Sequence, residues 1–181
     1  TEATSVSLTE DIKTVHTPQG SFEGKTLIIA TGADHAHLGL AEEEALTGRG
    51  VAYCAACDGM MYRGKTVAVV GGGNSAAADA ALLARVAEKV YLIHRRDQLR
   101  ASKVYHRPLE DTANLEFVWN AQVTGLLHED TLTGVEVTDV ISGEKRNIPL
   151  DGLFISIGRR PATSALQGQL ALDENGYIIA D

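Results

Sequence analysis

Hydrophobic and polar residues alternate through residues 5–30, and the turn signal TPQG at residues 17–20 divides this stretch into two runs. Alternation with a period of two is typical of strands that bury one face. The stretch ends in TLIIA at residues 26–30, whose continuous apolar character is typical of a buried strand. The pattern therefore predicts antiparallel strands followed by one buried strand.

The pattern changes at residues 65–94, where strand and helix signals follow one another closely. KTVAVV is a short β-branched run, GGGNS a glycine turn, AAADAALLARVA a strong helix former, and KVYLIHR a second apolar run. This order predicts a strand, a helix and a second strand, which together make one βαβ unit.

The segments on either side of this unit carry weaker signals. Residues 33–50 are polar and contain glycines, and a short helix is expected at LAEEEAL, residues 40–46. A second helix is expected to begin at Asp97, which would cap it, and Pro108 is expected to kink or end that helix. From residue 115 to residue 158 the pattern returns to strands, with a turn at SGEK, residues 142–145.

Two apolar runs resemble each other, LIIATG at residues 27–32 and LFISIG at residues 153–158. They are either two unrelated core strands or two crossings between domains, and we favour the second interpretation. The predicted fold is α/β, a Rossmann-like three-layer domain at residues 33–158, flanked by segments of a second domain at residues 1–32 and 159–181. Its layers are a parallel sheet, helices on one side, and an antiparallel β-meander from residues 115–150 on the other.

A glycine loop follows the first strand of the βαβ unit and opens its helix. This context makes the pattern Gly71-x-Gly73-x-x-Ala76 typical of a dinucleotide site. Gly71 permits the tight turn, Gly73 lets a pyrophosphate approach the backbone, and Ala76 lets helix and strand pack closely. The alternative is a turn with a structural role only. The candidate pyrophosphate-binding residues are Gly71, Gly72, Gly73, Asn74, Ser75 and Ala76.

The end of the second strand indicates which dinucleotide binds. Proteins that bind NAD place an acidic residue there to accept from the ribose 2′-hydroxyl. This chain instead has His94, Arg95 and Arg96, followed by Arg100. A guanidinium group pairs bidentately with phosphate oxygens, so these arginines suit a ribose 2′-phosphate. The alternative is an ordinary solvated face, but the position of the run relative to the glycine loop favours NADP(H).

The only two cysteines, Cys54 and Cys57, lie in VAYCAACDGMMY, with Asp58 directly after them. Three interpretations are open: a structural pair, a zinc site completed by His35 and His37, and a dithiol that cycles with a disulfide. We favour the third, in which Asp58 carries the proton that each step delivers or removes. Because hydride does not pass efficiently from NADPH into a disulfide, this interpretation also requires a two-electron relay, normally a flavin.

Composition limits the remaining function classes. The 16 basic and 24 acidic residues give a net charge of −8, which argues against a nucleic-acid partner because acidic chains repel phosphate backbones. No apolar run is long enough to span a bilayer, and the N-terminus lacks the features of a signal peptide. We therefore expect a cytoplasmic protein with no membrane partner.

Several motifs together resemble one known family. CAACDG, followed by VAVVGGGNSA and then HRRDQLR, is similar to the bacterial-type, low-molecular-weight thioredoxin reductases. LIIATGA upstream, and GLFISIG with Pro161 downstream, match the crossings between the FAD and NADPH domains of that family. The similarity covers essentially the whole chain in the order and spacing of the family.

The resemblance implies a homodimeric reductase that passes electrons from NADPH through FAD to a Cys54–Cys57 disulfide and on to thioredoxin, as its two domains rotate. It implies that Cys54 attacks the thioredoxin disulfide, that Cys57 faces the flavin, and that Asp58 is the acid and base. The implied NADPH contacts are Arg95, Arg96 and Arg100 with the 2′-phosphate, His94 with the adenosine, and Ile157 and Gly158 near the nicotinamide.

The chain departs from that family in two places. The FAD fingerprint expected near the N-terminus and a second FAD-contacting segment expected near the C-terminus are not in these residues, and the sequence begins at Thr1. We therefore expect an internal fragment that is inactive by itself and consists of a complete NADPH domain with strands of an FAD domain attached. Such a fragment could be monomeric. The alternatives are the flavin-dependent reductase of a peroxiredoxin system and an isolated NADP(H)-binding module.

Overall fold

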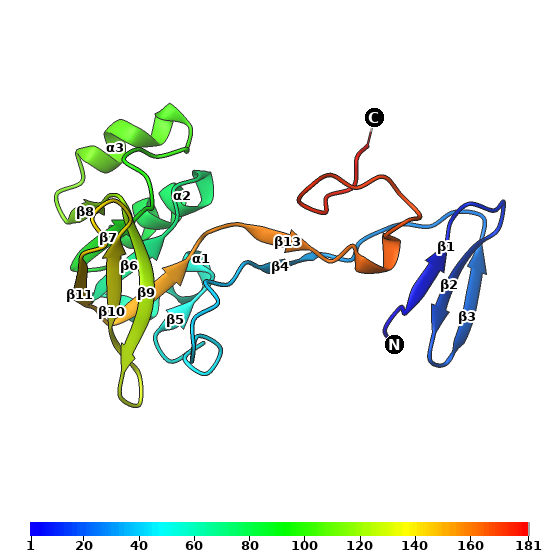
Figure 1. Cartoon of the computed structure of the whole chain (residues 1–181), viewed down its shortest axis with the longest axis horizontal. Coiled ribbons are helices and arrows are strands. Elements are labelled where there is room, and N and C mark those ends of the chain that lie inside the picture. Colours follow the sequence, from blue (N-terminus) through cyan, green and yellow to red (C-terminus); the bar gives the residue numbers. More distant parts are fainter. Residues whose placement is uncertain (181) are drawn as a thin grey trace. The chain divides into compact units, whose positions relative to one another are not determined.

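The computed structural model describes residues 1–180, and its contacts divide the chain into two units (Figure 1). The central unit is Ala36–Gly158, and the flanking unit combines Thr1–His35 with the residues from Arg159 onward. This division differs by three residues from the expected boundary after residue 32. The reason is that β4, Ala33–His35, pairs antiparallel with β13, Arg159–Pro161, inside the flanking unit.

The central unit is built on a parallel sheet of five strands in the order β5-β12-β6-β7-β8. The strands are β5 Val51–Ala52, β12 Gly152–Ile155, β6 Thr66–Val70, β7 Lys89–Ile93 and β8 Leu115–Val118. Strand β8 pairs with β7, so residues 115–118 extend the parallel sheet and do not belong to the expected meander.

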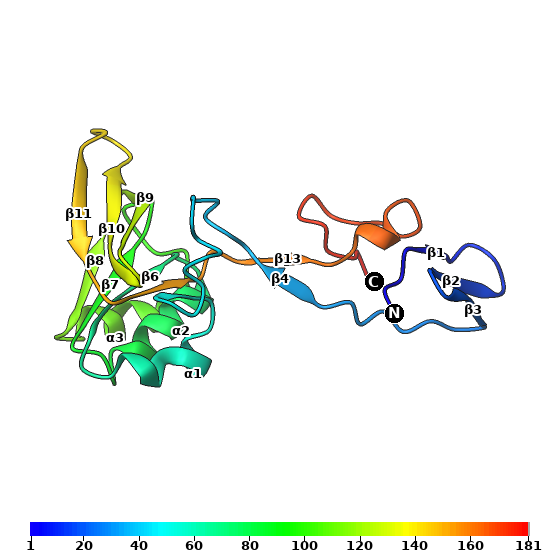
Figure 2. The same cartoon turned by 90° about the horizontal axis from the view of Figure 1, so that it is seen from below.

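Both faces of this sheet are covered, which confirms the predicted three-layer α/β fold (Figure 2). The helices α1 Ala55–Asp58, α2 Asn74–Leu83 and α3 His106–Glu110 lie on one side. On the other side lies an antiparallel sheet of three strands, β9 Ala121–His128, β10 Leu132–Asp139 and β11 Lys145–Pro149. Short 3-10 turns complete the unit at Gly59–Tyr62 and Lys103–Tyr105.

Alternation along the central strand divides the core into two clusters. Val67 and Val69 of β6 pack with α2 on the helix side, whereas Ala68 and Val70 pack with the antiparallel sheet. All four are buried, as expected for a parallel strand covered on both faces. This continuous apolar run is why the βαβ unit could be predicted from the sequence.

The flanking unit contains the predicted antiparallel strands near the N-terminus. These strands are β1 Ser5–Ser7, β2 Lys13–Thr17 and β3 Gly20–Gly24, in the order β1-β2-β3, and a 3-10 turn follows later at Ser164–Leu166. The expected strand at residues 26–30 is absent, and the Ile28 side chain is 91% exposed. An extended segment forms a strand only when a neighbour pairs with its backbone, and no strand within residues 1–180 pairs with this one.

Two expected helices are also absent. Residues 41–46 form turns, because Glu42 has a φ of +68°, a left-handed conformation that interrupts a right-handed helix. No helix begins at Asp97, because the backbone N–H groups of Arg100 and Ala101 donate to the Gly72 carbonyl and not to the preceding turn of their own segment.

Pro108 neither kinks nor ends a longer helix. It lies at the third residue of the five-residue helix α3, whose first-turn N–H groups have no partner within the helix. A proline therefore costs α3 no backbone hydrogen bond, and the expectation of a break at Pro108 was wrong.

Candidate functional site

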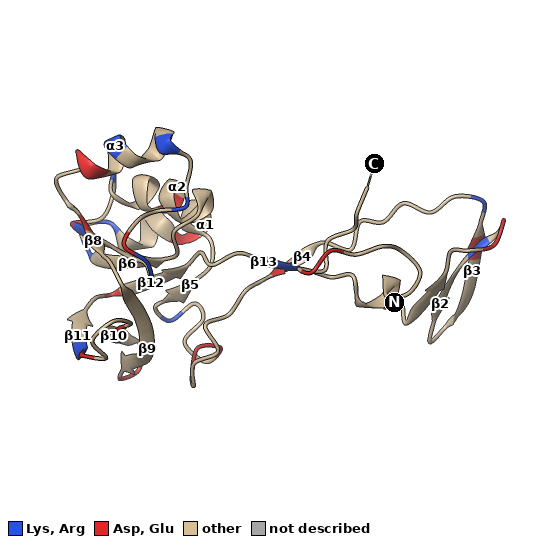
Figure 3. Cartoon of the chain, turned by 45° about the horizontal axis from the view of Figure 1, so that its top comes forward, with Lys and Arg blue, Asp and Glu red and all other residues tan. Residues whose placement is uncertain are grey.

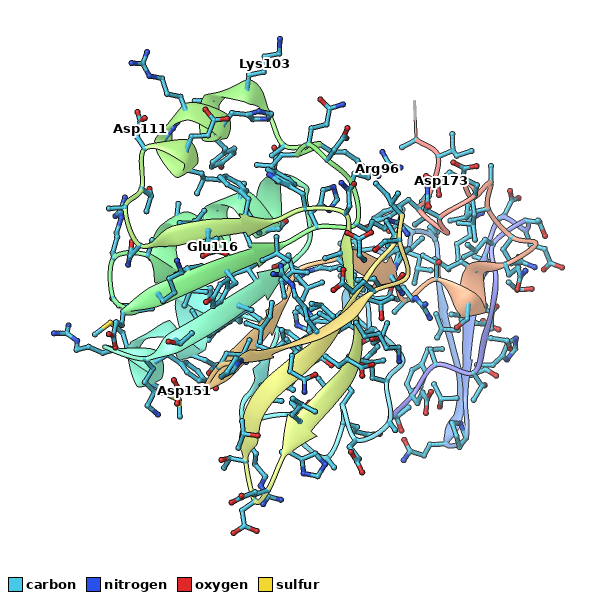
Figure 4. All side chains as sticks on the ribbon, turned by 60° about the vertical axis from the view of Figure 1, so that its left-hand side comes forward. Arg96, Lys103, Asp111, Glu116, Asp151 and Asp173 are labelled. Atoms are coloured by element: carbon cyan, nitrogen blue, oxygen red, sulfur yellow. A yellow bond between two sulfur atoms is a disulfide. The ribbon has the colours of Figure 1, made fainter. Side chains whose placement is uncertain are left out.

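A cavity of about 460 Å³ opens at the carboxyl ends of β6, β7 and β12 in the central unit. Ligands of open α/β sheets bind at this end of the strands. Arg96 and Asp151 mark the two ends of the sheet in Figure 4: Arg96 follows β7 at the cavity end, and Asp151 precedes β12 at the opposite end. The cavity volume lies in the range of about 300–1,000 Å³ that small-molecule and cofactor sites occupy.

Nearly all of the predicted nucleotide-binding residues line this cavity. They are Gly71, Gly72, Gly73, Asn74, Ser75, His94, Arg95, Arg96, Arg100, Ile157 and Gly158. Ala76 does not line it and is fully buried beneath the glycine loop. The sequence analysis missed His37, Leu38, Val70, Ile93, Ala121, Gln122, Val123 and Ser156, which complete the wall. Val70, Ile93 and Ser156 could have been found, because each lies at or just beyond the end of a predicted strand.

The glycine loop is shaped by close contacts that exclude side chains. Gly71 has a φ of +147°, and a Cβ added there would lie 2.3 Å from the Ser156 carbonyl oxygen and 2.8 Å from the Ala76 Cβ. A Cβ added at Gly72 would lie 2.3–2.5 Å from three atoms of the His94 ring. Gly73 has nothing within 4 Å of its added Cβ, so its backbone faces open space. A loop with this shape suits a phosphate group, because its backbone can be approached closely at the N-terminus of α2.

His94 lies at the base of the cavity and is 8% exposed. Its ring contacts Trp119 edge to face, and within the described part of the chain its Nε2 atom has no hydrogen-bond partner. Burial lowers the pKa of His94, and the neighbouring charges of Arg96, Arg95 and Arg100 lower it further. The imidazole therefore stays neutral beside a cluster of positive charge.

Asp79 connects helix α2 to the segment that follows β12. The Ser156 hydroxyl donates a hydrogen bond to the Asp79 carboxylate. Burial raises the pKa of Asp79, and the hydrogen bond from Ser156 partly offsets this. Because Ser156 directly precedes Ile157 and Gly158 in the cavity wall, this bond fixes the position of that wall relative to α2.

Cys54 and Cys57 form a disulfide at the start of α1, away from the cavity lining. The backbone N–H of Cys57 donates to the Cys54 sulfur at 3.1 Å. Cys57 is exposed, whereas Cys54 and Asp58 are half-buried. Two sulfurs in this geometry can be reduced to a dithiol and oxidised again, and Asp58 follows in the same turn.

The carboxylate of Glu43 is a buried anion that accepts hydrogen bonds from several donors. Glu43 is 3% exposed and accepts from the backbone N–H groups of Leu38, Gly39 and Leu40 at 2.9–3.3 Å. It also accepts from the Tyr53 hydroxyl at 2.7 Å. Burial raises the pKa of Glu43, but the hydrogen bonds outweigh burial and the net shift is downward. The charged carboxylate therefore connects the cavity-lining segment at Leu38 to the residue before Cys54.

The described part of the chain has neither of two other common site types. Among residues 1–180, no group of three or more His, Cys, Asp and Glu side chains is arranged to hold a metal ion. In the same range, no helix is long and apolar enough to cross a membrane. Basic and acidic residues are interspersed along the chain of the central unit, as Figure 3 shows around α3.

Comparison with known proteins gives the family of the chain. The sequence profile described as "Pyridine nucleotide-disulphide oxidoreductase" matches residues 1–181. The chain belongs to this family. Within the pyridine nucleotide-disulphide oxidoreductases, it is 43% identical over 178 residues to a thioredoxin reductase of Streptomyces clavuligerus, covering 98% of this chain and 55% of that relative. It is 46% identical over 164 residues to a thioredoxin reductase of Coxiella burnetii, covering 88% of this chain and 51% of that relative.

A solved structure shows the same similarity in three dimensions. The thioredoxin reductase of Lactococcus lactis matches with a TM-score of 0.90 and 34% identity, covering 99% of this chain and 60% of that one. The chain thus spans about half the length of the curated oxidoreductases it matches. The resemblance drawn from the motifs is confirmed at the level of the family and its fold.

Proposed function

We propose that the central unit binds NADP(H) and carries the redox disulfide of a thioredoxin-disulfide reductase. One observation carries the proposal: a glycine loop and three arginines line one cavity of a domain that also holds a Cys-x-x-Cys disulfide. The thioredoxin reductases among the relatives support the substrate class, a protein disulfide of the thioredoxin type.

The residues of the cavity fit a 2′-phosphorylated dinucleotide. In the proposal, the glycine loop and the N-terminus of α2 hold the pyrophosphate through backbone N–H groups. Arg95, Arg96 and Arg100 hold the 2′-phosphate through charge-assisted hydrogen bonds. Ile157 and Gly158 would lie near the nicotinamide, and His94 would contact the adenosine. When bound, NADPH and, in the whole protein, FAD would supply the two-electron chemistry that reduces the Cys54–Cys57 disulfide.

The two cysteines then perform thiol–disulfide exchange. Reduction of the Cys54–Cys57 bond takes up two electrons and leaves two thiols. A thiolate at Cys54 attacks the disulfide of the partner, so that one sulfur–sulfur bond forms as another breaks, and Cys57 then displaces the reduced partner. Asp58 moves the protons that these steps require. The hydrogen bond from the Cys57 N–H to the Cys54 sulfur supports Cys54 as the attacking thiolate.

The visible absorption spectrum of the purified chain, before and after NADPH is added, tests whether these residues hold a flavin. We expect a colourless protein that binds NADPH, since the FAD-binding segments expected for the family are not in this sequence. A flavin band that bleaches with NADPH would contradict the expected fragment. Failure of NADPH to bind would contradict the nucleotide assignment.

The protein that contains this chain tests the redox assignment. We expect Cys54→Ser and Cys57→Ser each to abolish NADPH-dependent thioredoxin reduction and to leave NADPH binding unchanged. An unchanged reduction rate in either variant would contradict the mechanism, whereas a whole protein that binds NADPH but reduces no thioredoxin would favour a pure NADP(H)-binding module. Homodimer formation and a cytoplasmic location are also proposed, on the resemblance alone, and size-exclusion chromatography and cell fractionation of the whole protein test them.

A further inference from the structure

Hydrogen bonds join the glycine loop to the segment that carries Arg100. The backbone N–H groups of Arg100 and Ala101 both donate to the Gly72 carbonyl, at 2.7 and 3.0 Å. The next residue, Ser102, donates its N–H to the Asn74 side-chain oxygen at 2.7 Å. Three successive N–H groups are therefore held by the loop that opens α2.

The same segment is fixed on its other side by packing. Leu99 and Ala101 belong to the core on the helix side and are 7% and 6% exposed. The His106 ring lies within hydrogen-bond distance of the Ala101 carbonyl, at 3.0 Å. Arg100, between these two buried residues, therefore has a fixed backbone and presents its side chain from the cavity wall.

These contacts change the role expected for Asn74. From the sequence, Asn74 is expected among the residues that contact a pyrophosphate. In the structure, its side-chain oxygen is directed to the Ser102 N–H, and this bond joins the first residue of α2 to the segment that ends the arginine run. A side chain engaged in this way acts on the ligand through the backbone that it holds.

We propose that Asn74 is a positioning residue that sets the preference for 2′-phosphorylated over 2′-hydroxyl dinucleotides, by fixing the segment that presents Arg100. This inference rests on the proposed NADP(H) function. It assigns discrimination between the two ligands to a residue on the pyrophosphate side of the cavity, and it predicts that loss of the Asn74–Ser102 bond affects only the ligand that carries the 2′-phosphate.

NADP⁺ and NAD⁺ are suitable probes, because they share the pyrophosphate and differ only in the 2′-phosphate. Both are titrated into the 181-residue chain and followed by NMR, which also reports weak binding. We expect Asn74→Ala to weaken NADP⁺ binding by about five-fold, which is the effect of one lost hydrogen bond. NAD⁺ binding should weaken by less than about two-fold, because NAD⁺ has no 2′-phosphate for Arg100 to hold.

The other end of the bond provides a matched pair of variants. Ser102 has a φ of −54°, which proline adopts, so Ser102→Pro removes the N–H donor with little change in φ. Ser102→Ala removes only the hydroxyl and keeps the donor. We expect Ser102→Pro to reproduce the selective loss of NADP⁺ affinity and Ser102→Ala to bind as wild type. The double variant Asn74→Ala/Ser102→Pro should lose no more affinity than either single variant, because both remove one bond.

The outcomes separate the inference from the function on which it rests. Equal weakening of both ligands by Asn74→Ala means direct contact with the pyrophosphate and overturns the inference, as does wild-type affinity in both Asn74→Ala and Ser102→Pro. Equal affinity of the wild-type chain for NADP⁺ and NAD⁺ contradicts the proposed NADP(H) function. Chemical-shift dispersion in the same spectra shows whether each variant is folded. If either Asn74→Ala or Ser102→Pro is unfolded, the affinities of the other variant test the inference.

Discussion

Replacing Glu43 tests whether one buried carboxylate stabilises the central unit. Glu43→Ala removes the acceptor of three backbone N–H groups and of the Tyr53 hydroxyl. The His37 ring, 3.2 Å from the carboxylate, counts little because its side chain is 56% exposed. Three backbone N–H donors thus lose this acceptor, whereas the Tyr53 hydroxyl keeps its contact with His37 Nδ1 at 2.8 Å.

The expected loss of stability is large for a single residue. Each buried donor left unsatisfied costs about 1–3 kcal/mol. The total cost is smaller than this value multiplied by the number of donors, because the surrounding backbone partly relaxes. Glu43→Ala removes the charge together with the acceptor, so the cost comes from the donors left behind, and we expect a loss of about 2–3 kcal/mol. Tyr53→Phe removes one of the donors and should cost about 1 kcal/mol. Glu44→Ala is the matched control, because that neighbouring carboxylate is exposed and should change stability by less than about 0.5 kcal/mol.

Urea unfolding, followed by the fluorescence of Trp119, measures these values, because the single tryptophan lies in the central unit. Hydrogen bonds hold the pKa of Glu43 below its usual value in the folded state, so its contribution is present above the unfolded pKa of about 4.3 and disappears as pH falls through the lower folded value. The wild type should therefore lose its advantage over Glu43→Gln on acidification. A Glu43→Ala variant as stable as the control would refute this reasoning.

Three further predictions concern the site. Gly72→Ala should lower the free energy of unfolding in urea by about 1–3 kcal/mol, because the added Cβ would overlap the His94 ring. Adding His94→Ala to this variant should restore most of the lost stability. An undiminished stability of Gly72→Ala would show that the ring moves freely. Burial and the hydrogen bond to Glu43 raise the pKa of Tyr53 to about 12. In an ultraviolet titration, Tyr53 should therefore be the last tyrosine to ionise, and comparison with Tyr53→Phe identifies its signal. Ionisation of Tyr53 together with the exposed tyrosines would contradict the hydrogen bond to Glu43. Thiol titration should find neither cysteine before reduction and both afterwards; free thiols in the untreated chain would exclude the Cys54–Cys57 disulfide.

The parts of the fold that sequence predicts are those set by neighbouring residues. The β6-α2-β7 unit was predicted because its strands are buried on both faces and its glycine loop lies between them. The helix expected from Asp97 was wrong because the N–H groups of Arg100 and Ala101 find a partner about thirty positions earlier, in Gly72, which no local pattern reveals. The left-handed backbone of Glu42 is equally unpredictable, since glutamate rarely adopts it.

The residues of the candidate site also fall into those that the sequence predicts and those that only the structure reveals. The glycine loop and the arginine run were predicted from motif and spacing, and the structure brings them to one cavity. His37 and Gln122 also line that cavity, yet they come from segments without a nucleotide motif and are placed there by the topology. Asn74 shows the reverse case, in which the motif identifies the residue and only the structure reveals its hydrogen-bond partner.

The two ends of the central unit lie side by side, because the N–H of Ala36 donates to the carbonyl of Gly158 at 3.1 Å. A domain whose entry and exit points are adjacent can be inserted into a surface loop of a host protein without stretching either. Residues 36–158 therefore have the geometry of a domain that can be inserted into another protein. For the same reason, a short linker between residues 36 and 158 would allow circular permutation of this domain.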